Sequence, residues 1–191
     1  KSVICLMTIL FIPLMAEING LLTLWLGKVP PYTSVFCVAL LISFLADQIT
    51  SGLNTANQAI GNIRNYSLLM YTPKLLLIPM ALLLLYLDYG PTGVMFLFVA
   101  IELLVALIRL PYMHHVSGLD MKHYIRTVLG RNSLLIIFMA AVSLSLKHTS
   151  TSAYRFFYSI PIAYIAGIVF AWAVVLTSKE RKKIKTSITS K

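Results

Sequence analysis

Residues 46–62 read ADQITSGLNTANQAIGN and combine an acid with glutamines, asparagines and hydroxyl side chains. On both sides of this polar stretch, the sequence consists of apolar runs long enough to cross a bilayer. Hydrocarbon cannot form hydrogen bonds with such side chains, so burying them unpaired in lipid is costly. The fold therefore depends on what this stretch faces.

The polar side chains of this stretch recur at helical spacing. The residues that share one face are Asp47, Thr50 or Ser51, Asn54 and Gln58, with Gln48 beside them. An Asp at the centre of an inserted helix costs about 2.5–3.5 kcal/mol, so this polar stripe must face other helices or water. Hydrogen bonding between helices is one interpretation, and the wall of a hydrated cavity is the other. The length of the stripe favours the cavity.

The composition of the chain indicates the solvent in which it folds. Of its 191 residues, 59% are hydrophobic and 12% are charged, and the mean hydropathy is +0.85. Soluble domains carry about 25% charged residues, because a domain of this size must cover its surface with polar groups. Lipid accommodates the apolar surplus, so the sequence predicts an all-α integral membrane protein.

A bilayer span needs about 20 mostly apolar residues, and six segments of the chain meet that requirement. They are predicted at residues 3–26, 34–60, 66–87, 92–113, 128–146 and 154–177. Pro13 interrupts the first span, and Pro73 and Pro79 lie inside the third. Prolines are tolerated in spans because neighbouring helices, hydroxyl side chains or water satisfy the freed carbonyls.

The distribution of Lys and Arg sets the predicted orientation. One side of the six-span topology carries few basic residues, whereas the other carries most of them together with the tail KERKKIKTSITSK at residues 179–191. Cytoplasmic loops are enriched in Lys and Arg, so both ends of the chain are predicted to be cytoplasmic. The net charge of +10 follows this membrane pattern, and no nucleic-acid partner is predicted.

Further ionisable residues are expected within or near the other spans. They are Glu17, Lys74, Glu102 and Arg109. Ionisable groups within spans usually face the interior of a bundle, form pairs or line a path. Glu102 lies near the middle of its span and is predicted to be paired or functional. Lys74 either shares such a role or extends to the membrane surface, and Arg109 is expected to extend to the surface.

Two segments of the chain carry a family resemblance. They are LTLWLGKVPPYTSVF (22–36) and GLNTANQAIGNIRNY (52–66). Together they resemble the bacterial polysaccharide exporters, the Wzx-type O-antigen flippases of the multidrug/oligosaccharidyl-lipid/polysaccharide superfamily. The weightiest pattern is A-x-G-x-I-basic-x-Y, met as Ala59, Gly61, Ile63, Arg64 and Tyr66, with Arg where Lys is commoner. The resemblance implies the C-terminal part of a two-lobed, MATE-like transporter fold of twelve to fourteen helices.

The resemblance also implies a division of the chain. Residues 1–115 would supply four transmembrane helices that complete the second transporter lobe, and residues 131–178 would supply two additional transmembrane helices. Residues 116–130 would form a cytoplasmic loop with a short interfacial helix, or else the polar first turn of the fifth span. Residues 179–191 would form a basic cytoplasmic tail.

Members of this family move undecaprenyl-diphosphate-linked oligosaccharide across the bacterial cytoplasmic (inner) membrane, coupled to an ion gradient, for O-antigen or other surface polysaccharide biosynthesis. The implied partners are the lipid-linked oligosaccharide, membrane lipids and a coupling ion, H⁺ or Na⁺. Arg64 and Lys74 are candidates for binding the diphosphate. Asp47, Glu102 and Glu17 are candidates for carrying the coupling ion. No cofactor, metal site or catalytic residue is predicted.

Two other functions compete with this hypothesis. A drug or organic-cation exporter of the same superfamily would have an acidic, aromatic cavity without cationic groups at its cytoplasmic side. A membrane-bound acyltransferase would use the H-x4-D motif of His115 and Asp120, in which the acid orients a histidine base. The phosphate-binding block that accompanies this motif is missing from the sequence, so a transporter is predicted rather than an enzyme.

Overall fold

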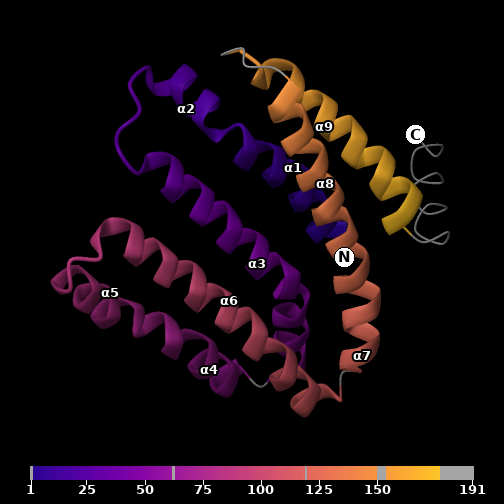
Figure 1. Ribbon diagram of the computed structural model, residues 1–191. Coiled ribbons are helices and arrows are strands. Elements are labelled where there is room, and N and C mark those ends of the chain that lie inside the picture. Colours follow the sequence, from indigo (N-terminus) through magenta and orange to yellow (C-terminus); the bar gives the residue numbers. More distant parts are fainter. Residues whose placement is uncertain (1, 62, 119, 150–153, 177–191) are drawn as a thin grey trace. The chain divides into compact units, whose positions relative to one another are not determined.

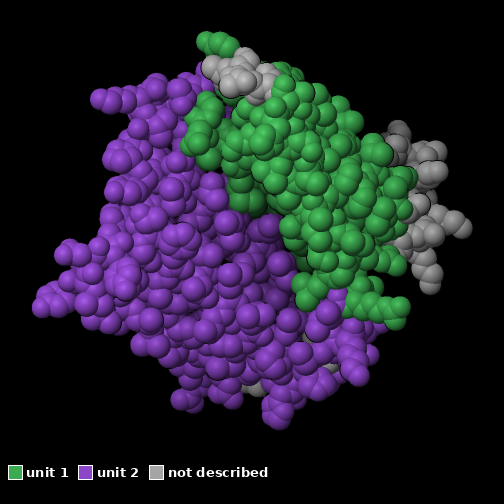
Figure 2. All heavy atoms as spheres, viewed as in Figure 1, with its two compact units in different colours: residues 1–20, 126–191 green, residues 21–125 purple. Residues whose placement is uncertain are grey.

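The computed structural model describes residues 2–61, 63–118, 120–149 and 154–176. In these ranges all regular secondary structure is helical, as predicted. Five of the described helices are long and apolar enough to cross a membrane, and a bent pair at the N-terminus makes six if it forms one span. The length and composition of these helices indicate a multi-pass membrane protein. The chain divides into two compact units, coloured separately in Figure 2.

Unit 2 comprises residues 21–125. Its long helices are α3 (Thr33–Ile60), α4 (Ile63–Leu75), α5 (Leu77–Tyr86) and α6 (Gly90–Ser117). Helix α6 packs against α3, which lies beside it in Figure 1, and also against α4 and α5. Its small apolar core contains Tyr66 and Met70 from α4 and Ile101 and Val105 from α6.

Helix α3 contains the polar stretch and has a defined end. Gly61 follows its last residue with φ 88°, and its N–H donates to the carbonyl oxygens of Asn57 and Gln58. Glycine is the residue that adopts this left-handed conformation without strain, so it ends the helix there. The 28 residues of α3 extend for about 42 Å at about 1.5 Å per residue. Asp47 therefore lies near mid-height of a helix longer than the hydrocarbon layer.

Unit 1 comprises residues 1–20 and 126–191. Helices α1 (Ser2–Ala16), α8 (Gly130–Thr149) and α9 (Phe156–Phe170) pack against one another, and the π-helix η2 (Ala171–Val175) continues α9. The residues of its core are Cys5, Ile9, Ile12, Leu135, Met139, Ala163, Ala171 and Val175. All of these are hydrophobic, and the rings of Phe138 and Phe170 stack beside them with centroids 4.1 Å apart.

The first predicted span is bent, although not where the sequence placed the interruption. Helix α1 continues through Pro13, and the chain bends by 71° at Glu17 before α2 (Ile18–Leu26). The Glu17 N–H still donates to the Pro13 carbonyl oxygen at 3.1 Å. Pro13 removes only the hydrogen bond toward the carbonyl four residues before it, which α1 tolerates.

The segment between the fourth and fifth spans is also helical. Helix α6 extends to Ser117, and α7 (Met121–Tyr124), the π-helix η1 (Ile125–Leu129) and α8 form one helix of 29 residues. Residues 121–130 are therefore continuous with the helix of the fifth predicted span; their place at the membrane surface or within the span stays a prediction. The basic tail, residues 179–191, lies outside the described residues.

The two compact units differ from the division that the family resemblance implied. They place α1 with α8 and α9, whereas the resemblance grouped the first span with the second, third and fourth. The units describe packing within this chain, so the completion of a transporter lobe by residues 1–115 stays a prediction.

Candidate functional site

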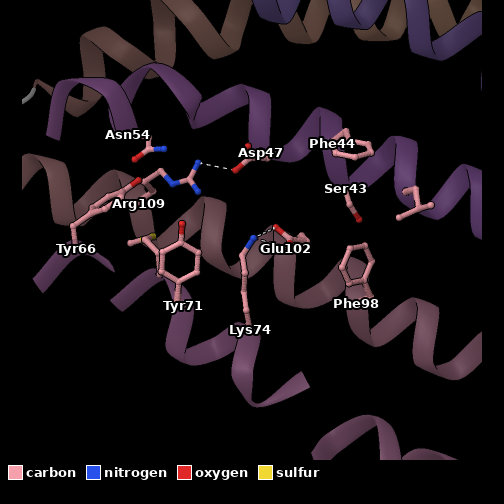
Figure 3. A pocket seen from close by; sticks show the side chains of 12 residues that line it. Ser43, Phe44, Asp47, Asn54, Tyr66, Tyr71, Lys74, Phe98, Glu102 and Arg109 are labelled. Atoms are coloured by element: carbon pink, nitrogen blue, oxygen red, sulfur yellow. Dashed lines mark hydrogen bonds and ion pairs between the residues drawn. The ribbon is translucent and has the colours of Figure 1, made fainter. Parts of the chain in front are cut away.

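Unit 2 contains a cavity of about 270 Å³ that is lined by residues of α3, α4 and α6. Its charged lining residues are Asp47, Lys74, Glu102 and Arg109; its aromatic ones are Phe44, Tyr66, Tyr71 and Phe98 (Figure 3). Ser43 and Asn54 add a hydroxyl and an amide. Pockets for drug-sized ligands measure about 300–1,000 Å³. This cavity therefore suits one small polar group and not a whole oligosaccharide.

Arg109 of α6 binds α3 through two contacts. Its Nη1 donates to Asp47 Oδ1 at 3.0 Å and to Thr50 Oγ1 at 2.8 Å. The Arg109 side chain is 7% exposed and the Asp47 side chain is 40% exposed. The prediction that Arg109 extends to the membrane surface is therefore wrong. An acid on the neighbouring helix compensates the buried cation, which would be strongly destabilising without a partner.

Lys74 of α4 and Glu102 of α6 form a second ion pair in the same cavity. The Lys74 Nζ lies 2.8 Å from Glu102 Oε1 and 2.9 Å from Oε2. Lys74 is thus paired instead of extending to the surface, and Glu102 is paired, one of its two predicted roles. With both acids ionised and both bases protonated, the four charges lining the cavity sum to zero.

Some buried donors around the cavity remain unused. Among the described residues, the Arg109 Nε and the hydroxyls of Tyr66 and Tyr112 have no hydrogen-bond partner. Tyr66 and Arg109 both line the cavity, and the ring centroids of Tyr66 and Tyr112 are 5.5 Å apart. A buried polar group without a partner costs about 1–3 kcal/mol, so most native ones are satisfied. Hydrogen-bonding capacity therefore remains beside the guanidinium.

The structure brings part of the predicted polar stripe to the cavity. Asp47 and Asn54 line it, whereas Gln48, Ser51 and Gln58 are not among its lining residues. The Ser51 hydroxyl donates instead to the Gln48 carbonyl oxygen at 3.1 Å, and Gln58 is exposed.

The buried face of α3 is rotated by about one residue, or about 100°, from the predicted stripe. It contains Ser43, Thr50, Leu53 and Asn57. Small and short side chains allow helices to approach closely. Of Thr50 and Ser51 the structure buries Thr50, and it buries Asn57 beside the exposed, longer Gln58.

The two residues predicted to bind diphosphate are separated. Lys74 lines the cavity, whereas Arg64 lies in the first turn of α4, is exposed and is not a lining residue. The structure adds Arg109 as a second basic group of the cavity. Arg109 follows Glu102 by seven residues, which places both on one face of a helix. That spacing was the available sequence signal for it.

Glu17, the third candidate for carrying the coupling ion, lies in unit 1. Arg155 Nε and Nη2 donate to its two carboxylate oxygens, both at 2.9 Å, and Arg155 Nη1 donates to the Lys147 carbonyl oxygen at 3.0 Å. The hydrogen bonds to Glu17 raise the pKa of Arg155 above its ordinary value, so the guanidinium stays charged. Glu17 therefore has a structural partner, and its coupling role stays a prediction.

Sequence reasoning missed a hydrogen bond made by Tyr124. Its hydroxyl donates to the Ile49 carbonyl oxygen at 2.7 Å and so ties α7 to the middle of α3. The two residues are 75 positions apart, and no local pattern signals such a contact.

Comparisons of the chain with protein-family models, with curated proteins and with solved structures found no match. The family resemblance consequently rests on the sequence segments quoted above. The arrangement of the cavity is an independent ground for a functional proposal.

Proposed function

We propose that this protein is a Wzx-type flippase that moves lipid-linked oligosaccharide across the bacterial cytoplasmic membrane, with both ends of the chain in the cytoplasm. One observation carries the proposal: a charged, hydrogen-bonding cavity lies at mid-length of α3 and α6, which are apolar enough to span a bilayer. Ionisable residues at such positions are costly and usually functional. The resemblance of residues 22–36 and 52–66 supports the same function.

The chemistry of the cavity suits part of such a substrate. Ser43, Asn54 and Tyr71 offer groups that replace water around sugar hydroxyls, so that desolvation is compensated. The volume of about 270 Å³ accommodates one sugar or one phosphate group at a time. The polyprenyl tail remains in lipid, where it loses no apolar contact.

Reconstitution into liposomes tests this function. Undecaprenyl-diphosphate-linked oligosaccharide placed in one leaflet is expected to become accessible to a glycosidase on the opposite side, and faster when an ion gradient is imposed. A rate equal to that of protein-free liposomes contradicts the proposal.

Coupling to the gradient is proposed to involve Asp47 or Glu102, because each is a carboxylate in the cavity. Asp47→Asn or Glu102→Gln is expected to abolish the acceleration by a gradient while leaving passive movement. Unchanged acceleration in both variants removes the coupling role from these residues. Repeating the assay with H⁺ and then Na⁺ gradients identifies the ion.

Export of organic cations is the second candidate, favoured by the aromatic rings of Phe44, Tyr66, Tyr71 and Phe98 around the cavity. The pairing of both cavity acids with bases weighs against it, because a cation would have to displace Lys74 or Arg109. Uptake of ethidium into the same liposomes distinguishes the two candidates.

The acyltransferase hypothesis finds less support. The Asp120 carboxylate accepts a hydrogen bond from the His123 backbone N–H at 3.1 Å and caps α7. Asp120 thus has a structural role as a helix cap, and the capping bond is the contact that the structure gives it. We therefore do not propose an enzymatic activity.

A further inference from the structure

The Arg109 guanidinium is engaged at one of its nitrogens and leaves another without a partner. Nη1 makes both contacts to α3, whereas Nε has no partner among the described residues. We propose that Arg109 is the anion-binding group of the cavity, that it takes a phosphate or diphosphate group, and that this group displaces Asp47. The inference rests on the proposed function for the identity of the natural ligand, although not for the chemistry of binding.

The site for such a group is formed by buried side chains. Arg109 is 5% exposed and Tyr66 is 6% exposed, yet both line the cavity. In Figure 3 the Arg109 side chain extends between Tyr66 and Asp47. The Arg109 Nε–H and the Tyr66 hydroxyl lack partners in the described part of the chain and are closed to solvent in the empty cavity, so an oxyanion would accept from them only once Asp47 has been displaced from the guanidinium. Hydrogen bonds from a guanidinium to an anion are among the strongest in proteins.

The presence of Asp47 decides which anions can bind. A ligand must compete with a carboxylate that already lies 3.0 Å from Nη1. A carboxylate ligand would exchange one monoanion for another and gain little. A phosphate group carries a charge of about −1.5 to −2 and three acceptor oxygens, so it can engage Nη1, Nε and the tyrosine together. The competition therefore favours phosphate over carboxylate.

Asp47 is also the cavity acid that can leave its partner more easily. A single oxygen contacts Arg109, and 40% of the side chain is exposed, so Asp47 can be hydrated when displaced. Glu102 instead holds Lys74 with both oxygens and is 12% exposed. Asp47 thus acts as an internal ligand that occupies Arg109 in the empty cavity. In the empty cavity Arg109 is free of Asp47 only for a fraction of the time. The apparent Kd for an external anion is the intrinsic Kd divided by that fraction.

Titration of the protein in phosphatidylcholine nanodiscs with inorganic diphosphate tests this exchange. Asp47→Asn is expected to tighten binding about tenfold, because Arg109 no longer has a competing carboxylate. Glu102→Gln is the matched comparison, since it removes one negative charge from the same cavity but frees Lys74 instead of Arg109. Only about a twofold tightening is expected, because an ammonium lacks the planar fork that binds a phosphate group through two nitrogens. Arg109→Lys keeps the charge but loses the Nε donor and the planar fork, and is expected to weaken binding at least about tenfold.

Several results would overturn the inference. Equal tightening in Asp47→Asn and Glu102→Gln would mean that only the net charge of the cavity matters. Unchanged affinity in Arg109→Lys, or no diphosphate binding by either the unaltered protein or Asp47→Asn, would remove Arg109 as the binding group. Tyr66→Phe adds a check that leaves the charges intact, and a loss of about threefold is expected if its hydroxyl donates to the anion.

The source of the phosphate is resolved by adding phosphatidic acid to the nanodiscs. Competition with diphosphate assigns the site to a lipid-borne phosphate, and its absence assigns the site to a soluble one; Arg109 is the binding group in both cases.

The outcome is separate from that of the liposome assay. Diphosphate binding with these variant effects but without oligosaccharide movement would refute the proposed function and leave the anion site standing. Oligosaccharide movement together with variants that leave diphosphate affinity unchanged would support the proposed function and refute the anion site.

Discussion

Arg155 and Arg109, which both bind acids in the part of the chain that the structure describes, differ in how many of their nitrogens donate hydrogen bonds. In unit 1, Arg155 donates from Nε and Nη2 to both oxygens of Glu17 and from Nη1 to a carbonyl. In unit 2, Arg109 makes its contacts from Nη1, and its Nε is unpartnered among the described residues. The first arrangement is closed and stabilises a fold. The second keeps donors free beside a cavity, as a binding site requires.

The two arginines also differ in the number of charged groups around them. Unit 1 buries neutral polar side chains, among them Thr8, Asn132 and Ser159, beside its apolar core, whereas unit 2 places two ion pairs around its cavity. Charged residues inside a membrane protein are costly and usually functional. Substitutions in the two units are therefore expected to separate stability from binding.

The largest effect is expected from Glu17→Gln. This change leaves Arg155, whose side chain is 17% exposed, without a charged partner. Because Arg155 is only partly buried, the expected loss lies at or below the lower end of the range of about 3–5 kcal/mol that breaking a fully buried ion pair costs. Thermal and chemical unfolding in detergent measure the loss. The double variant Glu17→Gln/Arg155→Gln should recover part of it, because no charge is left uncompensated. If the loss of unfolding free energy is no larger than for an exposed ion pair, the Glu17–Arg155 pair does not stabilise unit 1, and the contrast between the two arginines fails.

A smaller loss is expected from Thr50→Val, which keeps the shape of the side chain and removes the acceptor of the Arg109 hydrogen bond. Hydrogen bonds to charged groups contribute about 1.5–3 kcal/mol. Thr55→Val is the matched control on the same helix, because Thr55 is exposed and such changes usually stay within about 0.5 kcal/mol. Equal unfolding curves for the two variants would show that Thr50 does not hold Arg109.

A Gly→Ala substitution is expected to destabilise the protein in unit 1 and to stabilise it in unit 2. An added Cβ at Gly167 would lie 2.7 Å from Met139 Sδ and 3.1 Å from Ile9 Cγ1, whereas at Gly52 it would meet nothing within 4 Å. Gly167→Ala should destabilise the protein by about 1–3 kcal/mol through overpacking. Gly52→Ala should stabilise α3 by about 0.5–1 kcal/mol. Stabilisation by both changes, measured by thermal unfolding, would show that the core of unit 1 is loosely packed.

The smallest effects are expected from two tyrosine substitutions in unit 2. Tyr112→Phe removes a buried hydroxyl without a partner among the described residues and should leave stability unchanged or slightly raised. Tyr124→Phe removes the hydrogen bond to the Ile49 carbonyl and should cost about 0.5–1.5 kcal/mol. If Tyr112→Phe is the more damaging of the two in unfolding measurements, the Tyr112 hydroxyl has a bound partner.

The sequence predicted the helices well because lipid restricts what a span can be. A helix was expected over residues 34–60 and is found at Thr33–Ile60. In lipid, a long apolar segment must form all of its backbone hydrogen bonds internally, so it is helical. Its length and its helical state can therefore be predicted from composition. The bend at Glu17 was missed, because no proline or glycine marks that position in the sequence.

The site was less predictable, because it depends on how helices rotate against one another. Asp47 and Asn54 were identified from helical spacing and line the cavity. The partner of Asp47 is Arg109, 62 residues away, and nothing local in the sequence joins them. A rotation of α3 by about 100° exchanges one set of facing residues for the next. The periodicity therefore identified a polar helix without identifying which of its residues would be buried.

The balance of charge in the cavity affects how the protein would respond to membrane voltage. Asp47 and Glu102 offset Arg109 and Lys74, so movement of these four residues through the electric field transports no net charge. Each elementary charge moved across 100 mV is worth about 2.3 kcal/mol. Under the proposed function, the empty protein would therefore reorient with little influence of the potential on these residues. Once loaded with a multivalent anion, it would be driven outward in a cell whose interior is negative.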